Sequence, residues 1–334
     1  MKFVVLLGLI LNVCCEIRIG GIFHLSGFGS HWGKSERDAA WLAFKRHPDV
    51  KFIAEDSKSD PKECVAAFRK LATYDKVEAI LGPTWTACYF ALGPLSDQYK
   101  IPIIAPSGAD YTNQPVFAYR FGLFYRPQDL IKKVVDFIKK KEVKSVSIVY
   151  AQEPYFVQLM ENLTSQLQKE KILLFKEKIL PGERNFMTIL GKLPQVDAVS
   201  CFCDKAEYIA FNKALKVFKP DIVNFYVGGL SDEILENGLE TTIFVDYRTN
   251  EKFIKLFRQA FGYDPAPSAP MAFEGANFIA EVIRSSPKDI LNAIRSREHQ
   301  GEFLKIKFNQ RNSLEWENPE EIFTVIDKER RVLE

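Results

Sequence analysis

Short runs of β-branched and apolar residues alternate with amphipathic segments along the chain from Glu16 onward. This alternation is typical of strands joined by helices in a parallel sheet. The first series predicts strands at residues 17–23, 50–54, 77–81 and 101–105. A second series begins near Pro127 and predicts helices at 128–140 and 156–169 and strands at 146–150, 172–176, 198–203 and 224–227. The sequence therefore predicts two similar α/β halves.

The helix that begins after Asp60 has the clearest start signal. Asp60, Pro61 and Glu63 have the residue types of a helix N-cap, first position and third position. Apolar residues then recur at helical spacing, at Cys64, Ala67, Phe68 and Leu71. Nearer the end of the chain, the pattern predicts helices at 251–261 and 272–284 and strands at 304–308 and 322–326.

The length of 334 residues exceeds the size of about 250–300 residues at which one hydrophobic core usually stops growing. Two lobes are therefore expected. Hydrophobic residues make up 47% and charged residues 26% of the chain, which is the composition of a globular protein. The 45 basic and 43 acidic residues are scattered and give a net charge of +2, so the chain lacks the basic face that nucleic-acid binding requires.

The first fifteen residues have the order of a secretory signal. Lys2 precedes a run from 3 to 13 that is apolar except for Asn12, and small Cys14 and Cys15 follow. Cleavage after Cys15 is expected to leave Glu16 at the mature terminus of a periplasmic or other extracytoplasmic protein. A lipid anchor at Cys14 is the alternative, although Val13 fits that motif badly. No later stretch is apolar enough to cross a membrane.

The glycine-rich turn after the first strand does not have the spacing of a nucleotide site. A phosphate-binding loop needs four residues between its first glycine and Gly-Lys-Ser. Before Gly33-Lys34-Ser35, Gly29 leaves three residues and Gly27 leaves five. The dinucleotide pattern fails too, because Trp32 stands where its third glycine belongs. No nucleotide cofactor is expected.

Metal ligands and catalytic nucleophiles are also missing from the motifs. The four histidines show no metal-ligand spacing, and no Gly-x-Ser-x-Gly elbow follows a strand. Cys201 and Cys203 are two apart on a predicted strand, where we expect buried thiols badly placed to bond each other. Cys64 and Cys88 could pair in an exported protein, and their spacing leaves that open. Neither a metal nor another cofactor is predicted, and a non-enzymatic protein is favoured.

Hydroxyl-rich loops follow two of the predicted strands. The segment 84–86 (Thr-Trp-Thr) follows the third strand, and 107–110 (Ser-Gly-Ala-Asp) follows the fourth. In open α/β sheets, ligands lie beyond the carboxyl ends of strands. Backbone amides and small hydroxyls there can hold a carboxylate while Trp32 packs on an apolar part of the ligand. The alternative is ordinary helix capping by Thr86 and Ser107 with a buried Trp32.

Residues 17–33, with Leu25-Ser26-Gly27 and Trp32-Gly33, resemble the opening of the leucine/isoleucine/valine-binding proteins. These are solute receptors of ABC transporters with the type I periplasmic-binding-protein fold. The similarity continues at residues 60–62, 80–82, 103–107, 181–186, 261–265 and 272–275, with Arg120 and Gln128. Each motif is loose, but their order and spacing cover nearly the whole chain after residue 15.

The resemblance implies a two-lobed type I periplasmic-binding-protein fold, in which each lobe is a mainly parallel sheet flanked by helices. Three hinge crossovers are expected near 121–126, 244–249 and 308–311. Lobe 1 then combines residues 16–120 with 250–307, and lobe 2 combines 121–249 with 308–334. The ligand lies between the lobes and is buried when they close.

The resemblance also implies a ligand site. In such receptors the first lobe grips the α-carboxylate and α-ammonium through the loops after its third and fourth strands, which correspond here to Thr86, Ser107 and Ala109. Trp32 is expected at the cleft edge, and Tyr155 matches the aromatic residue of the second lobe.

Several positions depart from the family pattern. Ala109 lacks a hydroxyl that is common there, Asp204 replaces an aromatic residue, and Leu230 stands where an acid is expected to meet the ammonium. A buried ammonium needs an opposite charge. Asp204 is therefore predicted to supply it, with Asp232 or Asp110 as alternatives.

The expected function is that of an extracytoplasmic solute-binding protein of an ABC transporter. It is predicted to be a monomer that closes on an amino-acid-like or carboxylate ligand and delivers it to a membrane permease. A ligand-sensing receptor of the same fold is the first alternative. An enzyme that uses Asp110 and Asp204 as cleft carboxylates is the second and less favoured one.

Overall fold

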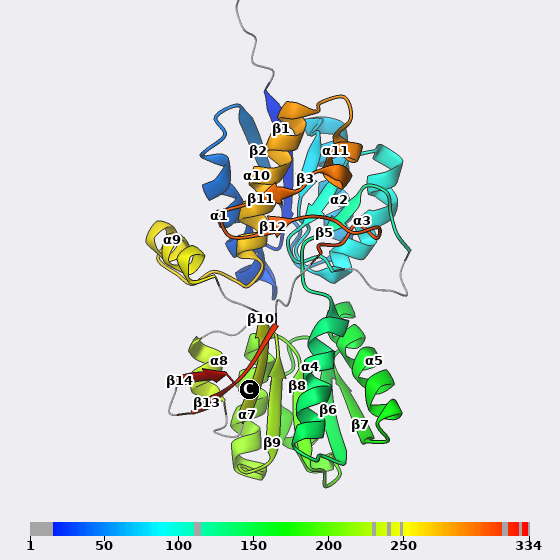
Figure 1. Ribbon diagram of the computed structural model, residues 1–334, viewed down its shortest axis with the longest axis vertical. Helices are drawn as coiled ribbons and strands as arrows, with labels where there is room; N and C mark the ends of the chain where they lie inside the picture. Colours follow the sequence, from blue (N-terminus) through cyan, green and yellow to red (C-terminus); the bar gives the residue numbers. More distant parts are fainter. Residues whose placement is uncertain are drawn as a thin grey trace, which may run out of the picture.

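The computed structural model describes residues 16–109, 115–228, 232–238, 242–247, 250–315, 320–326 and 329–332. The chain forms two lobes, one above the other in Figure 1, and each is built around its own sheet. After β10 (Thr242–Tyr247) the chain returns to the first lobe from residue 250 onward, and its last strands then join the second. Within the described segments, no helix combines the length and apolar character needed to cross a membrane.

The sheet of lobe 1 has five strands in the order β2-β1-β3-β4-β5, and all neighbours are parallel. The strands are β1 (Ile17–Phe23), β2 (Val50–Asp56), β3 (Ala79–Leu81), β4 (Ile103–Ala105) and β5 (Arg120–Gly122). The strand order reverses between β1 and β3, so the loops after these two strands diverge and leave a crevice at the carboxyl edge.

Helices cover both faces of this sheet. They are α1 (Ser30–Phe44), α2 (Pro61–Lys70), the π-helix η1 (Leu71–Asp75), α3 (Thr86–Tyr99), α10 (Ala269–Ser285) and α11 (Ile290–Ser296), with α9 (Glu251–Phe261) at the side in Figure 1. Ile19 and Leu81 pack into the core shared with α1 and α10, whereas Ile22 and Ile80 pack with α2 and α3. The alternation of side chains along each strand thus builds two apolar layers.

The sheet of lobe 2 has seven strands in the order β14-β13-β10-β9-β8-β6-β7. Its parallel part consists of β6 (Ser145–Ala151), β7 (Leu173–Ile179), β8 (Ala198–Phe202), β9 (Val223–Val227) and β10 (Thr242–Tyr247). Two antiparallel strands extend it, β13 (Glu320–Ile326) and β14 (Glu329–Val332). The parallel strand order 7-6-8-9-10 repeats the topology of lobe 1, with its own reversal between β6 and β8.

Helices also flank the second sheet. They are α4 (Pro127–Lys140), α5 (Pro154–Lys169), α6 (Phe186–Lys192), α7 (Lys205–Phe218) and α8 (Asp232–Asn237). Leu130 of α4 and Leu163 of α5 share one core cluster with Ile148, and Phe211 of α7 shares the other with Val199. The predicted two-lobed α/β fold with mainly parallel, helix-flanked sheets is confirmed.

The sequence prediction missed several elements. Helix α3 contains Gly93 and Pro94 in its middle, which read as a loop signal, yet it forms between the two sheet-edge loops. Strands β5 and β10 overlap the segments 121–126 and 244–249 that were predicted as hinges. The Leu314 N–H donates to the Gly122 carbonyl over 3.0 Å, so residues just before β13 lie beside the end of β5. The predicted lobe ranges stay a prediction.

The cysteines form disulfides in both lobes. Cys64 of α2 is bonded to Cys88 of α3, with 5.9 Å between their Cα atoms. Cys201 is bonded to Cys203, so the prediction that these two would not bond each other is wrong. Strand β8 ends at Phe202, and Cys203 therefore leaves the extended geometry and lies 5.6 Å from Cys201 between Cα atoms, within the range that a disulfide spans.

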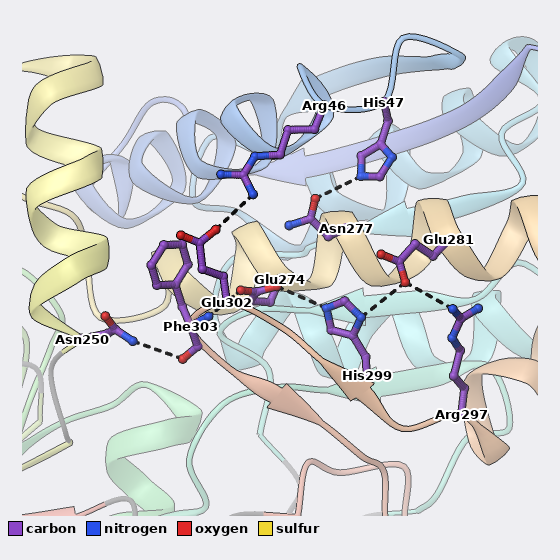
Figure 2. A network of polar contacts seen from close by, with 10 residues as sticks. All are labelled: Arg46, His47, Asn250, Glu274, Asn277, Glu281, Arg297, His299, Glu302 and Phe303. Atoms are coloured by element: carbon purple, nitrogen blue, oxygen red, sulfur yellow. Dashed lines mark hydrogen bonds and ion pairs between the residues drawn. The ribbon is translucent and has the colours of Figure 1, made fainter.

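Polar contacts attach the hairpin of β11 (His299–Gln300) and β12 (Lys305–Ile306) to α10. Figure 2 shows this network. Buried Glu274 accepts a hydrogen bond from the Phe303 N–H over 2.7 Å, and its second oxygen lies 3.2 Å from His299 Nε2. Glu281, about two turns further along the helix, forms an ion pair with Arg297. The hairpin is thus held by a carboxylate that would otherwise be buried without partners.

Candidate functional site

A cavity lies between the two lobes, at the carboxyl ends of both sheets. It encloses about 540 Å³ of space between protein atoms, part of it open to solvent. Lobe 1 lines it with residues at the starts of α1 and α3 and after β4, and lobe 2 with residues at the start of α5, after β8 and at the end of β9. The lining residues are Trp32, Trp85, Thr86, Ser107, Phe124, Glu153, Tyr155, Phe156, Cys203, Asp204, Tyr226, Val227 and Gly228.

Five of the seven residues predicted to form the ligand site meet in this cavity: Trp32, Thr86, Ser107, Tyr155 and Asp204. They come from five different loops or helix starts that are far apart in the sequence. Parallel α/β topology explains the convergence, because the carboxyl ends of all strands in such a sheet face the same edge. Their roles in binding stay a prediction.

Two predicted site residues are not part of the described lining. Ala109 is fully buried and packs in the apolar core, where its methyl group is removed from water. Asp110 and Leu230 lie outside the described residues. Asp232 is the first residue of α8.

Six of the thirteen described lining residues are aromatic. The centroid of Trp32 lies 6.5 Å from that of Trp85 and 5.9 Å from that of Phe124. Phe124 lies 5.9 Å from Tyr155, which lies 5.7 Å from Phe156. Neighbouring rings are turned 64–75° from each other. This edge-to-face arrangement is favourable between aromatic rings.

Direct contacts across the cavity join the two lobes. The indole Nε1–H of Trp32, on α1, donates a hydrogen bond to Asp204 Oδ1 over 3.4 Å. Asp204 is the N-cap residue of α7. Phe124, in the link between the lobes, packs against Tyr155 of α5. Asp204 is therefore held by a residue of the opposite lobe.

Glu153 is the lining residue that the sequence analysis missed. Its side chain is only 8% exposed, and Oε2 accepts a hydrogen bond from the Tyr155 N–H over 2.8 Å at the start of α5. Among the described residues Oε1 has no hydrogen-bond partner. Burial raises the pKa of this carboxyl to about 7, the negative charge of Asp204 raises it further, and the N–H groups of Tyr155, Phe156 and Ala87 oppose the shift. Glu before Pro154 signals a helix start, but no sequence feature indicates the burial.

Hydrogen bonds position the loop that carries Trp85 and Thr86. Trp85 has φ of +63°, in the left-handed region that is unfavourable for a bulky side chain, and its N–H donates to Ser107 Oγ over 2.8 Å. Beneath it, Glu36 accepts hydrogen bonds from Thr84 Oγ1 and Ser268 Oγ, each over 2.6 Å. Burial raises the pKa of Glu36 to about 7, against the effect of these hydroxyls. This network orients the loop and connects to the cavity lining through Ser107, whose hydroxyl also lowers the pKa of Glu36.

A family model described as periplasmic binding protein matches residues 16–308 of the chain. The chain therefore belongs to the periplasmic binding protein family, as the sequence motifs predict. Members of this family are substrate-binding proteins rather than enzymes, and the fold is that of the type I, two-lobed receptors.

Solved structures with the same fold bind different ligands. The branched-chain amino acid transporter substrate-binding protein LivJ from Streptococcus pneumoniae, in complex with isoleucine, superposes with a TM-score of 0.81 at 17% identity over 95% of this chain and 99% of that one. The leucine-binding protein LivK from Thermotoga maritima gives 0.80 at 16% over 95% and 98%. A solute-binding protein of R. palustris in complex with benzoate gives 0.81 at 14% over 95% of both chains. At these identities the likeness establishes the fold alone.

Proposed function

We propose that the protein is an extracytoplasmic solute-binding protein of an ABC transporter that captures a small organic ligand by closing its two lobes. The observation that supports this most directly is the cavity itself, because both lobes contribute its walls and Trp32 reaches Asp204 across it. A ligand that contacts both lobes only in the closed state shifts an existing equilibrium toward closure. The partner is then a membrane permease that recognises the closed monomer.

The proposed ligand is amino-acid-like. The hydroxyls of Thr86 and Ser107 and the start of α3 lie in lobe 1, and the carboxylates of Glu153 and Asp204 lie in lobe 2. A ligand with a positively charged nitrogen suits these acids. A simple carboxylate, the other ligand type that the resemblance suggests, would add negative charge to a site that already holds two acids.

Export is part of the proposal. The segment 1–15, which lies outside the described residues, has the order of a secretory signal. The disulfides Cys64–Cys88 and Cys201–Cys203 agree with it, because disulfides persist mainly in oxidising compartments. A soluble, cleaved form is proposed, with lipid anchoring at Cys14 as the alternative.

The function can be tested on protein that begins at Glu16. Native mass spectrometry identifies any co-purifying ligand, and small-angle X-ray scattering measures compaction when that ligand is added back after partial unfolding and dialysis. Trp32 and Trp85 line the cavity, so tryptophan fluorescence should change on binding. A Trp41→Phe variant is the control, because Trp41 is 48% exposed and does not line the cavity. A protein that retains no ligand, and stays the same size with every solute tried, would contradict the proposal.

A further inference from the structure

We propose that the cavity recognises a small organic cation, a substituted ammonium without a carboxylate of its own, through the carboxylate of Glu153 and the aromatic rings around it. The inference rests on the proposed function, because it specifies the ligand of the same cavity. It narrows the amino-acid-like ligand proposed above to a compound that has the ammonium group and lacks the carboxylate, and it departs from the family resemblance, which points to an amino acid whose carboxylate is held by lobe 1.

The charge of the cavity lining is the first argument. Glu153 and Asp204 both line it, and the described lining includes no Lys, Arg or His. Acids that closure removes from water need an opposite charge. Asp204 has the Trp32 indole as a donor, whereas no cation among the described lining residues serves Glu153.

One carboxyl oxygen of Glu153 has no hydrogen-bond partner among the described residues, which also favours a cationic ligand. More than nine-tenths of this side chain is buried, and one oxygen accepts the Tyr155 N–H while the other has no partner in the described part of the chain. A buried acceptor without a hydrogen-bond donor lowers the stability of the folded state, and a bound ligand that donates to it removes that penalty. A protonated amine of the ligand would supply both the donor and the charge, and a quaternary ammonium would supply the charge. Burial raises the pKa of Glu153 to about 7 in the absence of a cation, as expected for an acid that lacks its counter-charge.

The aromatic walls are the third argument. Trp85, Trp32, Phe124, Tyr155 and Phe156 form a chain of neighbouring rings with centroids 5.7–6.5 Å apart, and all five residues line the cavity. Cations, especially alkylated ammonium groups, are attracted to aromatic rings when they are removed from water. An uncharged apolar ligand would gain the burial but not this attraction.

The arrangement of lobe 1 disfavours a ligand carboxylate. Ser107 Oγ accepts the Trp85 N–H, and the Ser107 hydroxyl acts as a hydrogen-bond donor that lowers the pKa of Glu36, so its proton is directed away from a ligand carboxylate. The first turn of α3 favours an anion, but its Ala87 N–H already acts on the carboxyl of Glu153. A ligand carboxylate placed there would lie near the Glu153 carboxylate. A cation that lacks a carboxylate avoids this repulsion.

Two matched pairs of probes test the proposal by titration calorimetry. Choline and betaine share a trimethylammonium group, and isopentylamine and leucine share a side chain and an ammonium, but only betaine and leucine carry a carboxylate. We expect at least one cation to bind at least about tenfold more tightly than its zwitterion. The neutral choline isostere 3,3-dimethylbutan-1-ol should bind more weakly than choline. If both zwitterions bind more tightly, if the neutral isostere equals choline, or if neither cation binds at millimolar concentration, the proposal is wrong.

Variants assign the effect to Glu153. Glu153→Gln keeps the shape of the side chain and removes its charge, and it should weaken the bound cation at least about tenfold. Glu161→Gln, which changes an exposed acid on the same helix, is the matched control and should change nothing. Circular dichroism establishes that each variant is folded. If Glu153→Gln does not fold, Asp204→Asn is used with the same probes, and an unchanged cation affinity there overturns the two-carboxylate site.

The failure of this inference differs from a failure of the proposed function. A protein that closes on a co-purified zwitterion or anion, and ignores both cations, remains a solute-binding protein and refutes only the cation. A protein that neither retains a ligand nor compacts with any solute refutes the function as well.

Discussion

The substitution Glu153→Gln should make the stability of the protein less dependent on pH. Burial holds the pKa of Glu153 at about 7 instead of 4.5, and each pKa unit corresponds to about 1.4 kcal/mol. The folded state therefore binds this proton more tightly than the unfolded state does. This tighter proton binding contributes about 3 kcal/mol to the free energy of unfolding. The contribution is fully present below about pH 4.5 and is lost as the pH rises through about 7.

Glutamine does not ionise, so the variant lacks this loss. Relative to the wild type, Glu153→Gln should gain up to about 3 kcal/mol of unfolding free energy between pH 5 and pH 8. Glu36, whose pKa is also raised to about 7, is present in both proteins and cancels in the comparison. The difference between the two proteins thus reports Glu153 alone.

Urea unfolding at pH 5 and pH 8 measures this difference, with Glu161→Gln as the control that should follow the wild type. The reasoning is refuted if the wild type and Glu153→Gln differ by the same amount at both pH values. The same ionisation gives the cation affinity its direction: it should rise as the pH increases from 6 to 8 in the wild type and stay level in Glu153→Gln.

Three further predictions concern closure and stability. Trp32→Phe removes the donor to Asp204 and should weaken the ligand about threefold to tenfold by calorimetry, with a larger radius of gyration in solution; an unchanged radius argues against the contact. Replacing Cys64 and Cys88 together by alanine should cost about 3 kcal/mol in urea unfolding, and no loss would show that the bond contributes nothing. Glu274→Ala should destabilise the protein by about 2–4 kcal/mol and speed hydrogen exchange in residues 299–306, which a purely local surface effect would not do.

Local sequence signals were sufficient where an element depends on its own residues. The strand 17–23 and the helix 251–261 have the predicted bounds, since their apolar periodicity matches the faces that the structure buries. Asp60 caps α2 by accepting from the Lys62 N–H over 2.7 Å, with Pro61 at the first position. Helix α3 shows the limit, because Gly93 and Pro94 interrupt its pattern and packing overrides them.

The candidate site was only partly predictable, because strand ends and helix starts can be predicted from local sequence, whereas burial cannot. The rule that the carboxyl ends of parallel strands converge grouped Thr86 and Ser107 with Trp32, and the family resemblance added Tyr155 and Asp204.

The sequence by itself determined the alternation of strands and helices, the two halves and the loops that meet at one edge, because periodicity and capping act between near neighbours. Only the tertiary structure decided that Glu153 is buried, that Trp32 reaches Asp204, and that aromatic rings enclose the space between them. Burial and the resulting change in pKa depend on residues that are remote in sequence and are brought together by the meeting of the two lobes.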